Sequence, residues 1–315
     1  MIEVVVKARR DEAQDIVSLE LAAADGSELP AFDAGAHIEF HLPGGVIRHY
    51  SLCNDPLERH RYLLGILREP KSRGGSEAIF RSVYAGDSVL IGRPRNNFPL
   101  TRNAPRTILM AGGIGITPLL AMAHQLERDR SNFEMHYCSR SPARAAFAEV
   151  LAKAPFAQRV FHHYDDGGAD QQLHLARTLG EPNSGHHLYV CGPNGFITYV
   201  TEGAKSLGWS ASNLHVEYFS TDIDLRGDTF TVTAARSGIT CKVAAGNTIA
   251  EVLMQHGVDV PLSCEEGVCG TCLIPVVSGI PDHRDLVQTD KEKAANTYVA
   301  VCCSRSKTPV LVIDL

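Results

Sequence analysis

The sequence has no basic excess, no long apolar run and no low-complexity tract. Its 315 residues include 30 Lys and Arg against 36 Asp and Glu, a formal net charge of −6. Because nucleic-acid binding needs a basic surface, we expect no nucleic-acid partner. The longest uncharged, mostly apolar run is Thr107 to Ala123, and its glycines and proline favour a strand, a loop and a helix start over a membrane span.

The N-terminus also lacks the features of a signal peptide. Met1 to Lys7 reads as a strand, without a basic start, a long apolar core or a small-residue cleavage site. We therefore expect a cytoplasmic protein with no membrane partner. In that compartment, clustered cysteines indicate metal or redox chemistry before disulfides.

Three blocks of the chain differ in their apolar pattern. Residues 1–101 alternate short apolar runs with Gly, Pro and Asp turns, which predicts a small antiparallel β-barrel. Residues 102–222 alternate strands and helices, which predicts an α/β domain with a parallel sheet. We interpret the short polar segment 223–230 as a linker and residues 231–315 as a third domain.

Four of the nine cysteines fall in one pattern in the third block. Cys264, Cys269 and Cys272 form C-x4-C-x2-C, and a fourth cysteine follows at 302 or 303. This is the spacing of plant-type [2Fe–2S] ferredoxins, in which four thiolates hold two irons.

The glycines of the loop also fit an iron–sulfur cluster. Gly267 and Gly270 allow sharp turns and leave backbone amides free to donate to the sulfurs. A structural zinc site is the alternative, but it usually has paired cysteines on both sides of the spacer. Here one side carries three cysteines and the other side effectively one.

Two segments of the first block have the residue types that a flavin needs. Arg48-His49-Tyr50-Ser51 offers a cation for the phosphate, an aromatic surface and a hydroxyl group. Arg73-Gly74-Gly75-Ser76 precedes an expected helix, where free amides and the helix dipole bind anions. A plain strand and a plain turn are the alternative interpretations.

The second block carries a glycine-rich loop, Gly112 to Pro118, between an expected strand and an expected helix. Such a loop suits the close approach of a pyrophosphate. We expect Thr117 to be the helix N-cap and Pro118 to lie in the first turn. Ligands of open α/β sheets bind at the carboxyl ends of parallel strands. The candidate nucleotide-binding residues are Gly112, Gly113, Gly115, Thr117, Pro118, Ser139, Arg140, Cys191, Gly192 and Pro193.

Together these motifs resemble the phthalate dioxygenase reductase and vanillate O-demethylase reductase family, the reductase components of two-component Rieske oxygenases. The resemblance spans nearly the whole chain. It includes Cys302-Cys303-Ser304-Arg305, Pro281–Asp285 and the C-terminal Leu311–Leu315. It implies that Cys302 is the fourth cluster ligand and that the third domain has a β-grasp ferredoxin fold.

The resemblance further implies the cofactors and partners. FMN is expected rather than FAD, with Ile66, Leu67, Arg68 and Phe219 near it, and Ser51 and Cys191 at the contact between flavin and nicotinamide. NADH is expected rather than NADPH, although Arg140 could bind a 2′-phosphate. The expected protein is a monomeric reductase that serves a Rieske oxygenase and has no acid–base triad. The alternatives are a reductase that prefers NADPH or contains FAD and serves another oxygenase, a non-enzymatic electron carrier, and a zinc-stabilised regulatory or binding protein.

Overall fold

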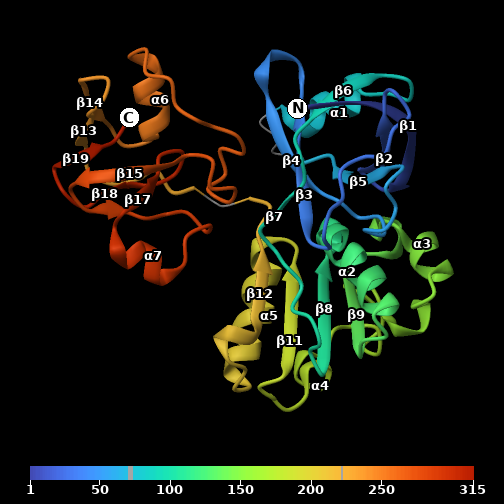
Figure 1. Ribbon diagram of the computed structural model, residues 1–315. Helices are drawn as coiled ribbons and strands as arrows, with labels where there is room; N and C mark the ends of the chain where they lie inside the picture. The colour runs from blue at the N-terminus through green and yellow to red at the C-terminus, as the bar shows by residue number, and fades with distance from the viewer. Residues whose placement is uncertain (70–73, 221–222) are drawn as a thin grey trace. The chain divides into compact units, whose positions relative to one another are not determined.

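The computed structural model describes residues 1–69, 74–220 and 223–315 (Figure 1). The chain divides into two compact units, Met1–Glu217 and Tyr218–Leu315. The first unit contains two large sheets and the second contains a third. Within the described residues, no helix is both long enough and apolar enough to span a membrane.

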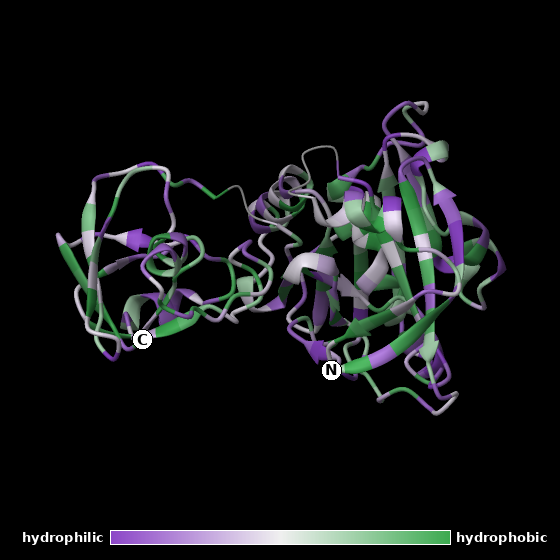
Figure 2. Cartoon of the chain, turned by 90° about the horizontal axis from the view of Figure 1, so that it is seen from above, coloured by the Kyte–Doolittle hydropathy of each residue, from purple (hydrophilic) through white to green (hydrophobic). Residues whose placement is uncertain are grey.

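The first sheet is antiparallel and has the strand order β4-β3-β6-β1-β2-β5, with β7 paired to β3. An isolated bridge between Leu52 and Leu64 joins the two ends of this order and closes the barrel. Apolar stretches broken by polar positions run along its strands, and the buried side chains fill the interior (Figure 2). The elements are β1 (Ile2–Ala13), β2 (Ile16–Ala23), β3 (Ala36–His41), β4 (Ile47–Ser51), β5 (Tyr62–Leu67), α1 (Gly75–Ser82), β6 (Ser88–Ile91) and β7 (Arg95–Asn96).

The second sheet is parallel throughout, in the order β10-β9-β8-β11-β12. Its central strand β8 is the point where the strand order reverses, which is where open α/β sheets bind ligands. The elements are β8 (Arg106–Gly112), α2 (Ile116–Arg128), β9 (Phe133–Ser139), α3 (Ala148–Lys153), β10 (Val160–Tyr164), α4 (Leu175–Leu179), β11 (His186–Cys191), α5 (Asn194–Ser206) and β12 (Leu214–Glu217).

The second unit is a mixed sheet in the order β14-β13-β19-β15-β17, in which β13 and β19 run parallel. Helix α6 contributes its buried face to the same core as this sheet, which gives the expected β-grasp arrangement. A two-stranded sheet pairs β16 with β18. The elements are β13 (Phe230–Ala234), β14 (Ile239–Val243), α6 (Ile249–Gln255), β15 (Leu273–Ser278), β16 (Pro281–Asp282), α7 (Asp290–Ala295), β17 (Tyr298–Ala300), β18 (Arg305–Ser306) and β19 (Val310–Ile313).

Candidate cofactor sites

The cysteines of the second unit come together from two segments. The loop before β15 carries Cys264, Cys269 and Cys272, and the turn after β17 carries Cys302. The Sγ atoms of Cys272 and Cys302 lie 3.2 Å apart, and the thiols of Cys264 and Cys269 contact each other. Cys264, Cys272 and Cys302 are each at most 4% exposed. The fold therefore places four thiols in two contacting pairs.

Backbone amides of the loop point at these sulfurs. The amide of Glu266 donates to Cys264 Sγ at 3.3 Å, and the amide of Gly267 donates to the sulfur of Cys302. Gly267 has a φ of +71°, and a Cβ there would lie 2.8 Å from Cys303 Sγ. Glycine is thus required both by the backbone conformation and by the close approach of Cys303.

The thiols are largely buried and close to one another, and both conditions disfavour the charged thiolate form unless a cation is bound to it. The contact with Cys269 and burial raise the pKa of Cys264. The contact with Cys302 and burial likewise raise the pKa of Cys272. Iron stabilises thiolates against both effects, so these residues fit a [2Fe–2S] cluster.

Cys303 touches the thiol of Cys302 but belongs to neither of the two pairs. It is fully buried, and its Sγ lies 3.8 Å from the carbonyl oxygen of Ala300 and 3.9 Å from Ser304 Oγ. This arrangement favours Cys302 over Cys303 as the fourth ligand, because Cys302 alone of the two has a short sulfur contact to Cys272.

The two flavin motifs meet in the first unit. Arg48 lies on β4, and Gly75 begins α1. A Cβ at Gly75 would lie 2.2 Å from Arg48 Nε, so the arginine side chain crosses the helix N-terminus. Gly74 precedes the helix with a φ of +93°, which favours glycine. A guanidinium next to the N-terminal amides of a helix can bind a phosphate. Arg73 lies outside the described residues.

The other candidate flavin residues differ in exposure. Tyr50 is half-buried and packs edge-to-face on Phe40, with 6.1 Å between the ring centroids. Ser76 is buried, and its Oγ accepts a hydrogen bond from the amide of Glu69 at 3.1 Å. The remaining candidates on this side are His49, which is half-buried, Ile66, which is fully buried, Leu67, which is half-buried, and Arg68, which is exposed and ion-paired with Glu77.

The glycine-rich loop packs on the turn that follows β11. A Cβ at Gly115 would lie 2.2 Å from the carbonyl oxygen of Cys191. A Cβ at Gly112 would lie 2.7 Å from the ring of Phe196 and 3.1 Å from Pro193. Both glycines are therefore required for this contact, which brings the two predicted nucleotide motifs, including Gly192, side by side at the carboxyl edge of the sheet.

The prediction that Thr117 is the helix N-cap is wrong. Helix α2 begins at Ile116 with Gly115 as its N-cap, because the short turn Gly113–Gly115 runs directly into the helix. Thr117 is instead buried in the first turn, and its Oγ1 donates to the carbonyl of Ile114 at 3.0 Å. Pro118 does lie in the first turn, as expected.

The remaining nucleotide candidates lie at the ends of strands. Ser139 ends β9 and is buried, with its Oγ donating to the carbonyl of Ser141 at 3.0 Å. Arg140 follows it and is exposed. Pro193 is the N-cap residue of α5. Phe219 belongs to the second unit and is 37% exposed.

Sequence reasoning missed one residue, Glu217. It ends β12 and pairs in register with Cys191 of β11. Its Oε2 accepts a hydrogen bond from Ser51 Oγ of the barrel at 3.3 Å. Burial raises the pKa of Glu217 to about 8, although the bond from Ser51 opposes this. Burial and the nearby Glu217 raise the pKa of Cys191.

Ser51, Cys191 and Glu217 thus meet where the barrel adjoins the parallel sheet of the same unit. A carboxylate at the carboxyl end of a parallel strand was the available signal in the sequence, because side chains at this edge face the ligand crevice. Cys191 is fully buried with a raised thiol pKa, so it stays a neutral thiol rather than a nucleophile.

Comparison with known proteins agrees with this arrangement. Residues 232–307 match the 2Fe-2S iron-sulfur cluster binding domain, and residues 93–214 match the N-terminal domain of dimethylamine monooxygenase subunit DmmA-like proteins. The vanillate O-demethylase oxidoreductase of Pseudomonas putida is 51% identical over 318 residues, covering 100% of both chains. The phthalate dioxygenase reductase of Burkholderia cepacia is 39% identical over 313 residues, covering 98% of this chain and 96% of the relative.

A solved structure has the same architecture. It is a phthalate dioxygenase reductase described as a modular structure for electron transfer from pyridine nucleotides to [2Fe-2S]. Its TM-score is 0.78 at 37% identity, and the match covers 100% of this chain and 98% of that one.

Proposed function

The chain belongs to the family of phthalate dioxygenase reductase and vanillate O-demethylase oxidoreductase, and from this premise we propose how its residues serve electron transfer. The protein is an oxidoreductase that passes electrons from a pyridine nucleotide through FMN to a [2Fe–2S] cluster and on to an oxygenase. The finer assignments are proposals: NADH as the donor, a Rieske-type oxygenase as the acceptor, a monomeric state and a cytoplasmic location.

The bound cofactors supply the redox chemistry: the flavin accepts a hydride and gives up electrons singly, and the cluster takes one electron at a time. The protein binds and orients these groups. Arg48 and the amides at Gly75 would hold the phosphate of FMN, and the loop around Gly115 would admit the pyrophosphate of the nucleotide. Cys191 and Glu217 shape the nicotinamide side of the crevice, and Ser51 shapes its flavin side.

Glu217 holds a proton near the site of hydride transfer. With a pKa of about 8, its carboxyl group is mostly neutral at pH 7. Its Oε2 still accepts a hydrogen bond from Ser51 Oγ at 3.3 Å. This arrangement keeps an uncompensated negative charge away from the place where hydride would approach the flavin.

The paired thiols of Cys272 and Cys302, surrounded by loop amides, are the observation that carries the proposal. The test is anaerobic mixing of the FMN- and iron-loaded protein with NADH. We expect loss of flavin absorbance, followed by the electron paramagnetic resonance signal of a reduced [2Fe–2S] cluster. No cluster signal at any NADH concentration would overturn the proposed route.

The choice between NADH and NADPH can be tested by comparing the kinetics of the two nucleotides. Arg140 is exposed at the end of β9, where it could reach a 2′-phosphate. We propose NADH, so kcat/KM with NADH should exceed that with NADPH. A preference for NADPH that disappears in Arg140→Ala would reverse this assignment.

The acceptor is proposed to be a Rieske-type oxygenase, because the matched relatives carry names of vanillate O-demethylase and phthalate dioxygenase systems. NADH-dependent product formation by a purified vanillate O-demethylase or phthalate dioxygenase oxygenase, with this protein as its sole reductase, tests the assignment. Reduction of cytochrome c without support of any Rieske oxygenase would contradict it.

A further inference from the structure

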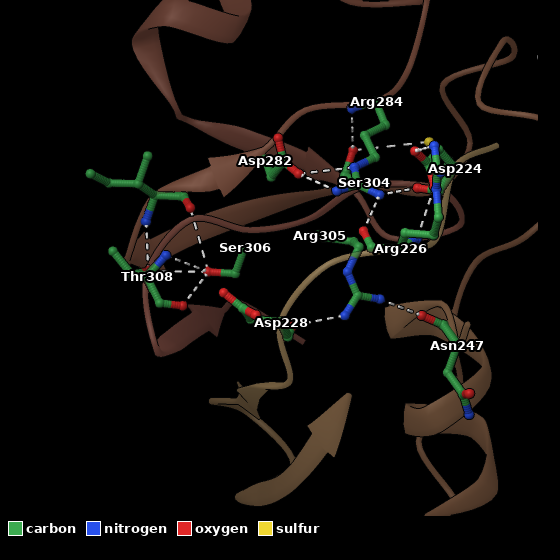
Figure 3. A network of polar contacts seen from close by, with 12 residues as sticks. Asp224, Arg226, Asp228, Asn247, Asp282, Arg284, Ser304, Arg305, Ser306 and Thr308 are labelled. Atoms are coloured by element: carbon green, nitrogen blue, oxygen red, sulfur yellow. Dashed lines mark hydrogen bonds and ion pairs between the residues drawn. The ribbon is translucent and has the colours of Figure 1, made fainter. Parts of the chain in front are cut away.

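Arg284 fastens the chain segment that precedes β13 in the second unit. Its Nη1 donates to the backbone carbonyl of Asp224 and, at 2.9 Å, to that of Arg226 (Figure 3). Its Nη2 and Nε both donate to Oδ2 of Asp282, at 2.6 and 2.9 Å. This ion pair orients the guanidinium, so that Nη1 faces the segment.

Arg305 also binds this segment. It is only 2% exposed. Its guanidinium donates to the carbonyls of Asp228 and Asn247 at 2.9 and 3.1 Å (Figure 3). It also donates to the carbonyl of Ala244 at 3.2 Å. It also lies over the ring of Phe230, 5.2 Å from the centroid. A buried guanidinium satisfied by carbonyls of separate segments holds those segments together.

Residues 224–228 pass close to both guanidinium groups at Gly227. Gly227 has a φ of +133°, and a Cβ there would lie 3.5 Å from both Arg284 Nη2 and Arg305 Nε. Leu225 completes the attachment, because its carbonyl accepts from the amide of Gly246 at 3.0 Å. The two arginines thus hold three of the four bound carbonyls in 224–228. We call Arg284, Arg305 and residues 224–228 the arginine clamp.

The arginine clamp joins this segment to the cluster-binding part of the unit. Arg305 follows the proposed ligand Cys302 by three residues. The backbone amide of Arg284 donates to Ser304 Oγ at 3.2 Å, on the same turn. Residues 224–228 are therefore bound to the chain that leaves the cluster site.

We propose that Arg284 and Arg305 are positioning residues for electron transfer from flavin to cluster, an inference that rests on the proposed electron route. With the clamp closed, at most 224 − 217 − 1 = 6 residues can act as a connector between Glu217 and Asp224. When the arginine bonds are lost and the single Leu225–Gly246 backbone bond opens with them, at most 230 − 217 − 1 = 12 residues can do so before β13 begins. The effective concentration of a tethered group falls roughly as the −3/2 power of the connector length, so opening the clamp lowers it about threefold.

The experiment uses the full-length protein loaded with FMN and iron. Stopped-flow mixing with NADH resolves flavin reduction from cluster reduction in Arg284→Ala and in Arg284→Ala/Arg305→Ala. We expect an unchanged first phase and a cluster-reduction rate constant that falls about threefold in the double variant. Arg236→Ala is the matched control, because Arg236 forms an equivalent pair with Asp314 away from the segment, and it should change neither phase.

A second variant keeps the test independent of folding defects around buried Arg305. Insertion of six Gly and Ser residues after Ser220 lengthens the connector while the arginine clamp stays intact, and it should slow cluster reduction by a similar factor. Hydrogen exchange of the Gly246 amide, which donates to the carbonyl of Leu225, supplies a readout besides activity. It should accelerate in the arginine variants and stay unchanged in the insertion variant.

Three outcomes would overturn the inference: faster exchange with unchanged cluster reduction, unchanged exchange in the arginine variants, or an insertion that has no effect on the second phase. The proposed function fails differently, because the cluster of the unmodified protein would then not be reduced by NADH at all.

Discussion

The cluster site and the flavin–nicotinamide site are built in opposite ways. Three of the proposed cluster ligands lie within nine residues, Cys264 to Cys272, and a glycine-containing loop aims its amides at them. The other site collects Arg48, Gly75, Cys191 and Glu217 from four separate stretches of the first unit. The difference shows that a site formed mostly by one loop is specified by local spacing, whereas a site at the junction of two sheets is specified by the fold.

The largest expected effect is loss of the cluster while the flavin site keeps its activity. Cys272→Ser removes a proposed ligand whose Sγ lies 3.2 Å from that of Cys302, so the [2Fe–2S] cluster should not assemble. Flavin reduction by NADH, followed with ferricyanide as acceptor, should persist because it depends on the other unit.

Cys303→Ser is the matched control for this change, because Cys303 is equally buried but has no short sulfur contact to Cys272. Iron content and the visible spectrum should stay normal in it. A Cys303→Ser protein without a cluster, beside a normal Cys302→Ser protein, would reverse the assignment of the fourth ligand.

The next effect concerns Glu217 and has a defined sign. Its pKa in the folded protein is raised to about 8 from 4.5, so between these pH values the folded protein keeps a proton that the unfolded chain has lost. The free energy of unfolding should therefore fall as the pH rises through this window. Glu217→Gln removes this contribution and should gain stability relative to the parent, by on the order of a few kcal/mol at most, between pH 5 and pH 9.

Urea unfolding followed at both pH values checks this prediction. Ser51→Ala is a useful companion, because it removes the hydrogen bond that holds the pKa of Glu217 down. In Ser51→Ala the free energy of unfolding should fall more steeply as the pH rises. A parent protein whose stability rises from pH 5 to pH 9 relative to Glu217→Gln would contradict the account.

A smaller effect is expected at the phosphate side of the flavin site. Arg48→Ala removes the cation that lies across the start of α1. Loss of a hydrogen bond to a charged group should weaken FMN binding roughly 10–100-fold. Titration of the apoprotein with FMN and with riboflavin measures this, and an equal loss for riboflavin, which has no phosphate, would exclude the assigned role.

The smallest effect tests the corrected position of Thr117. Its Oγ1 donates to the carbonyl of Ile114, within the turn that leads into α2. Thr117→Val keeps the shape and removes this bond, which should lower the free energy of unfolding by about 1 kcal/mol. Thermal unfolding checks it, and a loss of several kcal/mol would show a larger capping role than the structure gives.

Local patterns in the sequence predicted the fold class and the cysteine cluster well. Short alternating strands, an α/β rhythm and C-x4-C-x2-C each depend on neighbouring residues. The two kinds of sheet are confirmed in the structure and the [2Fe–2S] domain by the matched family, while the four cysteine ligands stay a prediction. Glu217 could not be ranked above other acidic residues, because its role depends on Ser51, 166 positions away in the chain. Thr117 was misplaced because the turn at Gly113–Gly115 moves the helix start.

Direct observation of the reduced cluster tests the central claim most sharply. When the FMN- and iron-loaded protein is mixed anaerobically with NADH and frozen at increasing times, we predict that the [2Fe–2S] resonance grows in after flavin absorbance is lost. The same experiment on Cys272→Ser should show the flavin change alone. A resonance that appears before flavin reduction, or that persists in Cys272→Ser, would contradict a route from flavin to a cluster held by this loop.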